Sequence, residues 1–264
     1  MIENIGKKKR LERIFKDNGK AFVVPVDDLL ICGPNKHLEK YDEKIRQFNH
    51  LPVDAVLGFP GVFNQFYDSL KQKSWIINLT TSTFLNDHTN KKLSLTLQNA
   101  ISNGAEAVAV HVNMTSPKEN EMIQNLGLIS CECQTLGIPL MAIVYARKPG
   151  VDKDDNYELL KVNNNSLYTD LVSHACRVAV ELGADIIKTN YTGNEHSFKK
   201  VIRASGNVPV VIAGGDFVDE DTIIKNTQEA INAGASGVCF GRNFFYRDNI
   251  VEFAEKIERI IKNG

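Results

Sequence analysis

The chain has 264 residues, of which 43% are hydrophobic and 24% charged, and its formal net charge is −1. These values are ordinary for a globular protein, and the length is close to that of one (β/α)8 barrel. The near-neutral charge balance argues against nucleic acid as a partner. No apolar run approaches the roughly 18 residues that a membrane span needs, and no apolar segment follows Met1. We therefore expect no membrane partner, no secretory signal and a cytoplasmic location.

The one basic cluster runs from Lys7 to Arg10, within a segment whose apolar residues have helical spacing. A solvated helix face explains this cluster better than a targeting signal does. The sequence predicts an N-terminal helix within residues 1–20 that packs on the rest of the chain. The five cysteines are scattered without a CxxC pair, and no His/Cys cluster has the spacing of metal ligands. We expect reduced thiols and no metal.

Eight short apolar segments are predicted to be strands, and segments typical of helices separate most of them. The strands are expected at residues 21–26, 54–58, 75–79, 107–112, 139–144, 184–191, 208–212 and 236–240. Helices are expected at residues 35–49, 61–71, 93–102, 118–136, 166–182, 219–233 and 249–262. The polar segment 147–165 is predicted to be a loop that could act as a lid.

Most of the predicted strands are continuous apolar runs, which is typical of a parallel sheet buried on both faces. Four helix-to-strand junctions contain a glycine shortly before the strand: Gly104, Gly137, Gly183 and Gly234. A doubly wound open sheet is the rival architecture, but eight βα units in this length favour closure. We predict one α/β domain over residues 1–264, a (β/α)8 TIM barrel with an extra N-terminal helix.

Lys188 is the candidate catalytic residue, because the strand at 184–191 carries it near its C-terminal end. In a parallel barrel the C-terminal ends of the strands surround the active site, so this lysine is expected at the barrel mouth. Burial and nearby cations lower a lysine pKa, and the neutral amine can attack a carbonyl carbon to form a Schiff base. The alternative is a structural ion pair with Asp or Glu.

Glycines follow the last two strands at Gly214-Gly215 and at Gly241, and Arg242 comes next. Backbone N–H groups at such turns can converge on an anion, and an arginine adds charge-assisted hydrogen bonds to phosphate oxygens. This pattern predicts a phosphate site, against the alternative that tight βα turns simply need glycine.

Tyr145 ends the strand before that of Lys188 and is a candidate acid/base, with a pKa expected to fall beside Lys188 and Arg147. The alternative is a core tyrosine. Asp27, after the first strand, would hold substrate hydroxyls or take part in proton transfer, or it caps the next helix. The other polar residues at strand ends are Asp28, Asn78, His111, Asn113, Arg147 and Asn243. Of these, Asp28, His111 and Arg147 are the candidate substrate contacts, although His111 also fits a packed histidine behind the site.

Four segments carry a resemblance to a known family: residues 109–113, 185–193, 210–215 and 237–243. They resemble the archaeal-type class I fructose-bisphosphate aldolases, a family that also contains 2-amino-3,7-dideoxy-threo-hept-6-ulosonate synthase and synthases of aminohydroxybenzoate precursors. The resemblance covers about residues 21–248. It implies a (β/α)8 barrel in which the Schiff base forms without a metal or other cofactor, and a homo-oligomer such as a decameric ring. The roles that it implies are Lys188 as Schiff-base former, Tyr145 as acid/base, Asp27 as the strand-1 carboxylate, and phosphate bound by Gly214, Gly215, Gly241 and Arg242.

The chain departs from the family pattern at three places near the barrel mouth. Asp27-Asp28-Leu29 stands for the usual Asp-His-Gly, Phe59-Pro60-Gly61 for His-Lys-Gly, and Ile143 for the tryptophan that the fructose-bisphosphate aldolases tend to have. Two of these changes remove basic groups that could meet a second phosphate. We therefore expect a synthase that joins a phosphorylated ketone, such as dihydroxyacetone phosphate, to an unphosphorylated aldehyde, by analogy aspartate semialdehyde. The alternatives are a fructose-1,6-bisphosphate aldolase, a phospho-sugar isomerase and a non-catalytic phosphate-binding barrel.

Overall fold

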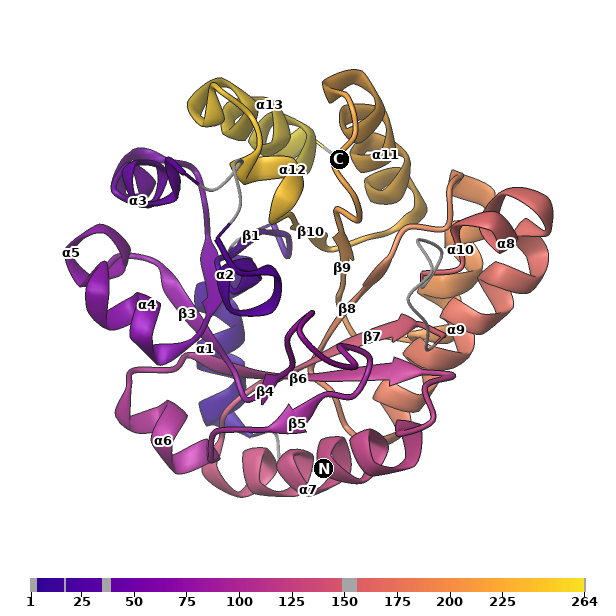
Figure 1. The fold of residues 1–264 in the computed structure, drawn as a ribbon, viewed down its shortest axis with the longest axis horizontal. Coiled ribbons are helices and arrows are strands. Elements are labelled where there is room, and N and C mark those ends of the chain that lie inside the picture. The colour runs from indigo at the N-terminus through magenta and orange to yellow at the C-terminus, as the bar shows by residue number, and fades with distance from the viewer. Residues whose placement is uncertain (1–3, 17, 35–38, 149–155, 264) are drawn as a thin grey trace.

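The computed structural model describes residues 4–16, 18–34, 39–148 and 156–263. Eight parallel strands close into a barrel in the order β1-β10-β9-β8-β7-β6-β3-β2 (Figure 1). The strands are β1 (Ala21–Pro25), β2 (Ala55–Gly58), β3 (Ser74–Asn78), β6 (Ala107–Met114), β7 (Leu140–Ala146), β8 (Ile186–Asn190), β9 (Val210–Ala213) and β10 (Gly237–Cys239). Each overlaps one of the eight predicted strands, and the predicted fold class is confirmed.

Helices surround the barrel (Figure 1). They are α1 (Ile5–Phe15), α2 (Asp28–Cys32), α3 (Tyr41–Ile45), the 3-10 helix η2 (Phe48–His50), α4 (Pro60–Gln65), α5 (Tyr67–Leu70), α6 (Leu97–Ser102), α7 (Glu119–Leu136), α8 (Glu158–Asn163), α9 (Asn165–Glu181), α10 (Glu195–Ala204), α11 (Glu220–Ala233), α12 (Arg242–Phe245) and α13 (Ile250–Asn263). None of the helices in the described part of the chain is long and apolar enough to cross a membrane.

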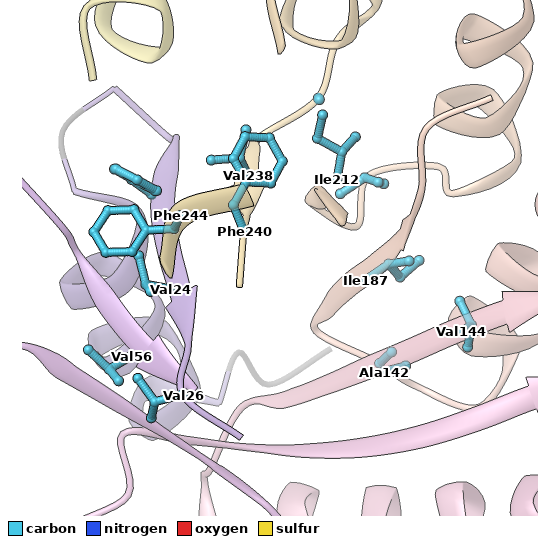
Figure 2. Packing of buried hydrophobic residues seen from close by; sticks show 14 of the residues in the cluster. Val24, Val26, Val56, Ala142, Val144, Ile187, Ile212, Val238, Phe240 and Phe244 are labelled. Carbon is cyan, nitrogen blue, oxygen red and sulfur yellow. The ribbon is translucent and has the colours of Figure 1, made fainter. Parts of the chain in front are cut away.

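The barrel strands alternate between two apolar layers, as the period of a strand requires. Residues such as Val24, Ala142, Val144, Ile187 and Val238 point outward and belong to the cluster beneath the helices (Figure 2). Their neighbours along the strands point inward and fill the barrel axis: Val23, Met141, Ile143, Ile186 and Cys239. A side chain at a strand end therefore reaches either the barrel mouth or the helix layer, according to its parity.

The N-terminal helix α1 closes the bottom of the barrel, as predicted for residues 1–20. Its Ile14 and Phe15 belong to the inner apolar cluster. The buried ammonium of Lys7 pairs with Asp185, 2.7 Å away, just before β8. Part of the basic cluster is thus a structural ion pair and only part of it is a solvated face.

The predicted helix at 35–49 is wrong in extent. Residues 35–38 lie outside the described part of the chain, and the rest contains only the short α3 and η2. Tyr41 and Phe48 both pack on Phe245, with ring centroids 4.8 and 6.0 Å apart.

Two other helical predictions and one loop prediction need correction. The segment 61–71 is two helices that break at Phe66, and the segment 93–102 becomes helical only at Leu97, after the cap residue Thr96. Before Leu97, β5 (Lys92–Leu93) pairs antiparallel with β4 (Thr80–Thr81), and this hairpin after β3 was not predicted. The expected loop 147–165 contains α8, and its residues 149–155 lie outside the described part, so its role as a lid stays a prediction.

Candidate active site

One cavity, partly open to solvent, lies at the C-terminal ends of the strands. All ten predicted site residues line it: Asp27, Asp28, His111, Tyr145, Arg147, Lys188, Gly214, Gly215, Gly241 and Arg242. These residues come from β1, β6, β7, β8, β9 and β10 or the loops that follow them, and only barrel closure brings them together.

Lys188 faces the inside of the barrel. It has the same parity as the inward Ile186, and its register partners are Ile143 on β7 and Val211 on β9. Only 7% of the residue is exposed. The next residue, Thr189, points outward and donates its hydroxyl to the carbonyl oxygen of Val144 at 2.9 Å. Because side chains alternate along β8 and Thr189 points outward, the amine of Lys188 lies on the cavity side.

The structure contradicts the expected fall in the Lys188 pKa. Burial pulls this pKa down, but the negative charge that Cys239, Tyr145 and Asp27 can carry, with a hydrogen bond to Cys239, outweighs burial and raises it. The resting side chain is an ammonium ion, which must lose a proton before its nitrogen can attack a carbonyl carbon. No aspartate or glutamate in the described part forms an ion pair with Lys188, so the structural alternative loses support.

Tyr145 also faces inward, next to Ile143 in the inner cluster. Its ring packs edge-on against His111 with centroids 4.9 Å apart, and the guanidinium of Arg147 lies 5.6 Å from the ring centroid. The expected fall in its pKa is wrong, because burial raises the pKa of the phenol and outweighs the opposing charges of Lys188 and Arg147. Tyr145 is therefore protonated at rest and is equipped to give a proton first.

Asp27 is buried at the start of α2 and accepts a hydrogen bond from the Nδ2 of Asn78 at 3.1 Å. The Oδ1 of Asn78 in turn accepts from the backbone N–H and the hydroxyl of Thr80, at 3.0 and 2.9 Å. Asp27 makes no side-chain cap bond to α2, so its predicted capping alternative does not hold. Asn78 does not line the cavity but fixes the orientation of the carboxyl group that does.

The glycines after β9 and β10 meet on one side of the cavity. The Nδ2 of Asn243 donates to the carbonyl oxygens of Gly214 and Asp216 at 2.9 and 2.8 Å, and its Oδ1 accepts from the N–H of Val218 at 3.1 Å. A side chain at Gly214 would meet Asn243 at 3.2 Å. The loop is thus held close to the next strand, with its backbone available to an anion.

Two carboxyl groups lie beside this loop. The guanidinium of Arg242 pairs with Asp216 at 2.5 Å. Burial, and then the charge of Asp27, raise the pKa of Asp28 to about 6. The Oδ2 of Asp28 lies 3.0 Å from the position that a Cβ on Gly241 would occupy. An anion docking here would therefore meet Asp28 most favourably in its protonated form.

His111 lines the cavity and is otherwise buried. Burial first, and then the charges of Lys91, Arg147 and Lys188, hold the pKa of its imidazole well below the usual range. The ring is neutral at physiological pH. Its Nε2 has no hydrogen-bond partner among the described residues. A buried nitrogen without a partner is costly to the folded state.

Sequence reasoning missed Lys91, Phe84 and Cys239, which also line the cavity. Lys91 is 3% exposed, whereas its neighbour Lys92 pairs with Glu121 on the surface. Nothing in the polar segment around them distinguishes the two lysines. No group of three or more His, Cys, Asp or Glu in the described ranges is arranged to hold a metal ion.

Fold and site together define a class of protein: a barrel with an inward lysine, tyrosine and aspartate around one cavity, flanked by glycine turns on the side of the last two strands. That class is the lysine-dependent barrel enzymes. The DeoC/LacD family aldolase profile matches residues 21–247, and the chain belongs to this family and is a class I aldolase.

Curated relatives and a solved structure extend the match. The chain is 35% identical to the 2-amino-3,7-dideoxy-D-threo-hept-6-ulosonate synthase of Halobacterium salinarum, over 92% of this chain and 87% of that protein. It is 31% identical to the 2-amino-4,5-dihydroxy-6-oxo-7-(phosphonooxy)heptanoate synthase of Streptomyces griseus, over 97% and 90%. An archaeal fructose-1,6-bisphosphate aldolase, solved with its catalytic lysine covalently bound to the carbinolamine intermediate, superposes with a TM-score of 0.81 and 25% identity over 96% of this chain and 98% of that one.

Proposed function

We propose that this aldolase condenses dihydroxyacetone phosphate with aspartate semialdehyde through a Schiff base on Lys188. The observation that carries the proposal is the inward, buried Lys188 in one cavity with Tyr145 and Asp27. The glycines after β9 and β10 support a phosphate-bearing donor on the side of Arg242.

The product named for the Streptomyces relative supports this pair of substrates. It is a seven-carbon chain with a 2-amino acid at one end, hydroxyls on carbons 4 and 5, a 6-oxo group and a phosphate on carbon 7. Breaking the bond between carbons 4 and 5, as an aldolase does next to a ketone, leaves a three-carbon phosphorylated ketone and a four-carbon amino acid aldehyde. These two pieces are dihydroxyacetone phosphate and aspartate semialdehyde.

In the first stage, the Lys188 ammonium gives its proton to Asp27, the carboxylate whose charge acts on it. The nitrogen then adds to the ketone carbon to give a carbinolamine. Tyr145, protonated at rest, gives its proton to the departing hydroxyl, and water leaves. The resulting iminium ion withdraws electrons from the adjacent carbon.

In the second stage, the Tyr145 phenolate takes a proton from the carbon that carries the free hydroxyl, and an enamine forms. The enamine carbon attacks the aldehyde, and the same phenol protonates the new alkoxide. Asp27, oriented by Asn78, holds the substrate hydroxyls. Water then hydrolyses the iminium and frees Lys188, so atoms and protons balance over the cycle.

Fructose-1,6-bisphosphate aldolase activity is the second candidate, because archaeal aldolases with that name superpose closely on the chain. The synthase reading is favoured by Phe59-Pro60-Gly61, where a basic group for a second phosphate would otherwise stand. An isomerase or a non-catalytic barrel does not explain a lysine held in the cavity. Metal independence, a homo-oligomeric assembly and a cytoplasmic location stay predictions.

The test incubates the protein with dihydroxyacetone phosphate and borohydride and maps the reduced adduct by mass spectrometry. We expect one adduct, on the peptide that holds Lys188. Lys188→Met should lose both the adduct and carbon–carbon bond formation. Lys199→Met, at an exposed lysine on α10 that pairs with Glu195, is the matched control and should keep both. Near-normal carbon–carbon bond formation by Lys188→Met would refute the assignment of Lys188 as the lysine that forms the Schiff base.

A further inference from the structure

Lys91 is a buried cation that has no role in the catalytic cycle proposed for Lys188, Tyr145 and Asp27. It directly precedes β5 in the β4–β5 hairpin and lines the active-site cavity although only 3% of it is exposed. Its ammonium donates to the hydroxyl of Ser82 at 2.5 Å. Burying a lysine charge is costly unless it is paired, and a hydroxyl is a weak partner for it.

The segment that presents Lys91 is tightly held. Thr89 is fully buried, its hydroxyl bonds Asp87 at 2.7 Å, and its carbonyl oxygen accepts from the Nδ2 of Asn113 at 2.8 Å. The hydroxyl of Ser82 donates to the carbonyl oxygen of His88 at 2.8 Å, which ties the two sides of the hairpin together. The ammonium is therefore positioned by the fold and is not a chance conformation of a surface chain.

The surroundings of Lys91 are rich in positive charge. Arg147 acts on it most strongly of the charged groups, and burial and this neighbour lower the Lys91 pKa to about 8 against the weaker pull of Asp27, Cys32 and Asp28. Among the charged groups, Lys91 and Arg147 lower the pKa of His111 most, and the Nε2 of this histidine has no partner among the described residues. Two cations, Lys91 and Arg147, thus line the cavity beside a neutral imidazole, and such a group of donors favours an anionic ligand.

The β4–β5 hairpin, which Lys91 directly adjoins, lies across the barrel from the loops after β9 and β10. In the closed order, β9 stands four strands from β3, and β10 stands four strands from β6. Figure 1 shows the β4–β5 hairpin, which follows β3, on the opposite side of the mouth from β9 and β10. A donor attached to Lys188 with its phosphate at Gly214 and Gly241 would leave the Lys91 side to the second substrate.

We propose that Lys91 and Arg147 form a second anion site, which binds the negatively charged group of the acceptor aldehyde and sets the specificity of the enzyme. This inference rests on the proposed function and deepens it. The chemistry requires an aldehyde that bears a carboxylate or a phosphate within reach of its carbonyl carbon. One ammonium and one guanidinium that line the same cavity can bind either group.

The test measures addition to four aldehydes with dihydroxyacetone phosphate as donor: aspartate semialdehyde, succinate semialdehyde, glyceraldehyde 3-phosphate and uncharged butanal. Lys91→Met should raise KM for the preferred anionic acceptor by roughly 10- to 100-fold, the usual effect of losing one charge-assisted hydrogen bond. It should change kcat/KM for butanal less than about twofold. Lys91→Arg should restore most of the loss, and Lys92→Met is the control at the adjacent exposed lysine.

Borohydride trapping distinguishes a failure of the proposed function from a failure of the second anion site. If wild type traps the donor on Lys188 and Lys91→Met does too, a selective loss with anionic acceptors supports the second site. Equal losses with charged and uncharged acceptors would make Lys91 structural and overturn the inference alone. If Lys91→Met fails to fold, Lys91→Gln and Lys91→Arg are compared by the same ratio of anionic to neutral acceptor. If the wild-type protein forms no trapped adduct with the donor, both the proposed function and the second anion site are refuted. The preferred anionic acceptor shows whether the site takes carboxylate or phosphate.

Discussion

Replacement of Asp28 by asparagine should stabilise the protein at neutral and alkaline pH. Burial and the neighbouring Asp27 raise the pKa of Asp28 from 3.8 to about 6, so folding disfavours the ionised carboxylate. A tenfold change in an ionisation constant is worth about 1.4 kcal/mol, and this shift therefore costs the folded state up to about 3 kcal/mol. Water in the open cavity screens part of the charge. We expect Asp28→Asn to raise the free energy of unfolding by roughly 1–3 kcal/mol at pH 8.

The dependence on pH follows from the sign of the shift. Below pH 3.8 the carboxyl is protonated in both states and the penalty is absent; it grows as pH rises and is complete above about 6. The advantage of the variant over wild type should therefore be largest at pH 8. About half of it should remain at pH 5, and almost none near pH 3.5.

Urea unfolding followed by the fluorescence of the single tryptophan, Trp75, measures this difference at each pH. In thermal unfolding, the gain at pH 8 corresponds to roughly 2–4 °C for each kcal/mol. Asp170→Asn, on the exposed side of α9, controls for the loss of one negative charge. A gain of equal size at pH 3.5 and pH 8, or no gain at pH 8, would refute the electrostatic explanation.

Three further outcomes are expected. Tyr145→Phe should lower kcat by roughly 10²- to 10⁴-fold while the borohydride-trapped donor adduct still forms, because the ring is kept and only the proton shuttle is lost; undiminished turnover would exclude the phenol as acid/base. Gly237→Ala should lose about 3 kcal/mol or more in urea unfolding, because the new Cβ would lie 1.9 Å from a carbonyl oxygen of β1 at a φ of +130°; Gly61→Ala, which has open space, is the control. Asp185→Asn should lose about 2–3 kcal/mol because it leaves Lys7 buried without its partner, and the loss should shrink in the Lys7→Met background.

Part of the site was predictable because its signals are local. Gly214, Gly215, Gly241 and Arg242 directly follow apolar strands, and Lys188 lies near the end of one, so the barrel rule alone brings them to one end. The rule requires no knowledge of contacts between distant residues. It explains why all ten predicted residues line one cavity.

Three errors in the prediction share one cause, which is dependence on distant partners. The pKa values of Lys188 and Tyr145 are raised because burial and neighbours from other strands act together, and their balance has no trace in either strand alone. The β4–β5 hairpin also depends on residues apart in sequence, since its two pairs join residues eleven and thirteen positions apart. Neither short strand would be stable or recognisable by itself.

What the sequence by itself determined is the order of the elements and the class of fold, because strand composition, glycine stops and the number of βα units are properties of successive residues. The direction of each side chain was decided only by the tertiary structure. In strands that are apolar on both faces, such as Leu140–Ala146, nothing in the composition marks the inward residue. Closure of the barrel selects Tyr145 and Lys188 for the cavity, and it also brings Lys91, from an unremarkable polar segment, to the opposite side of the same mouth.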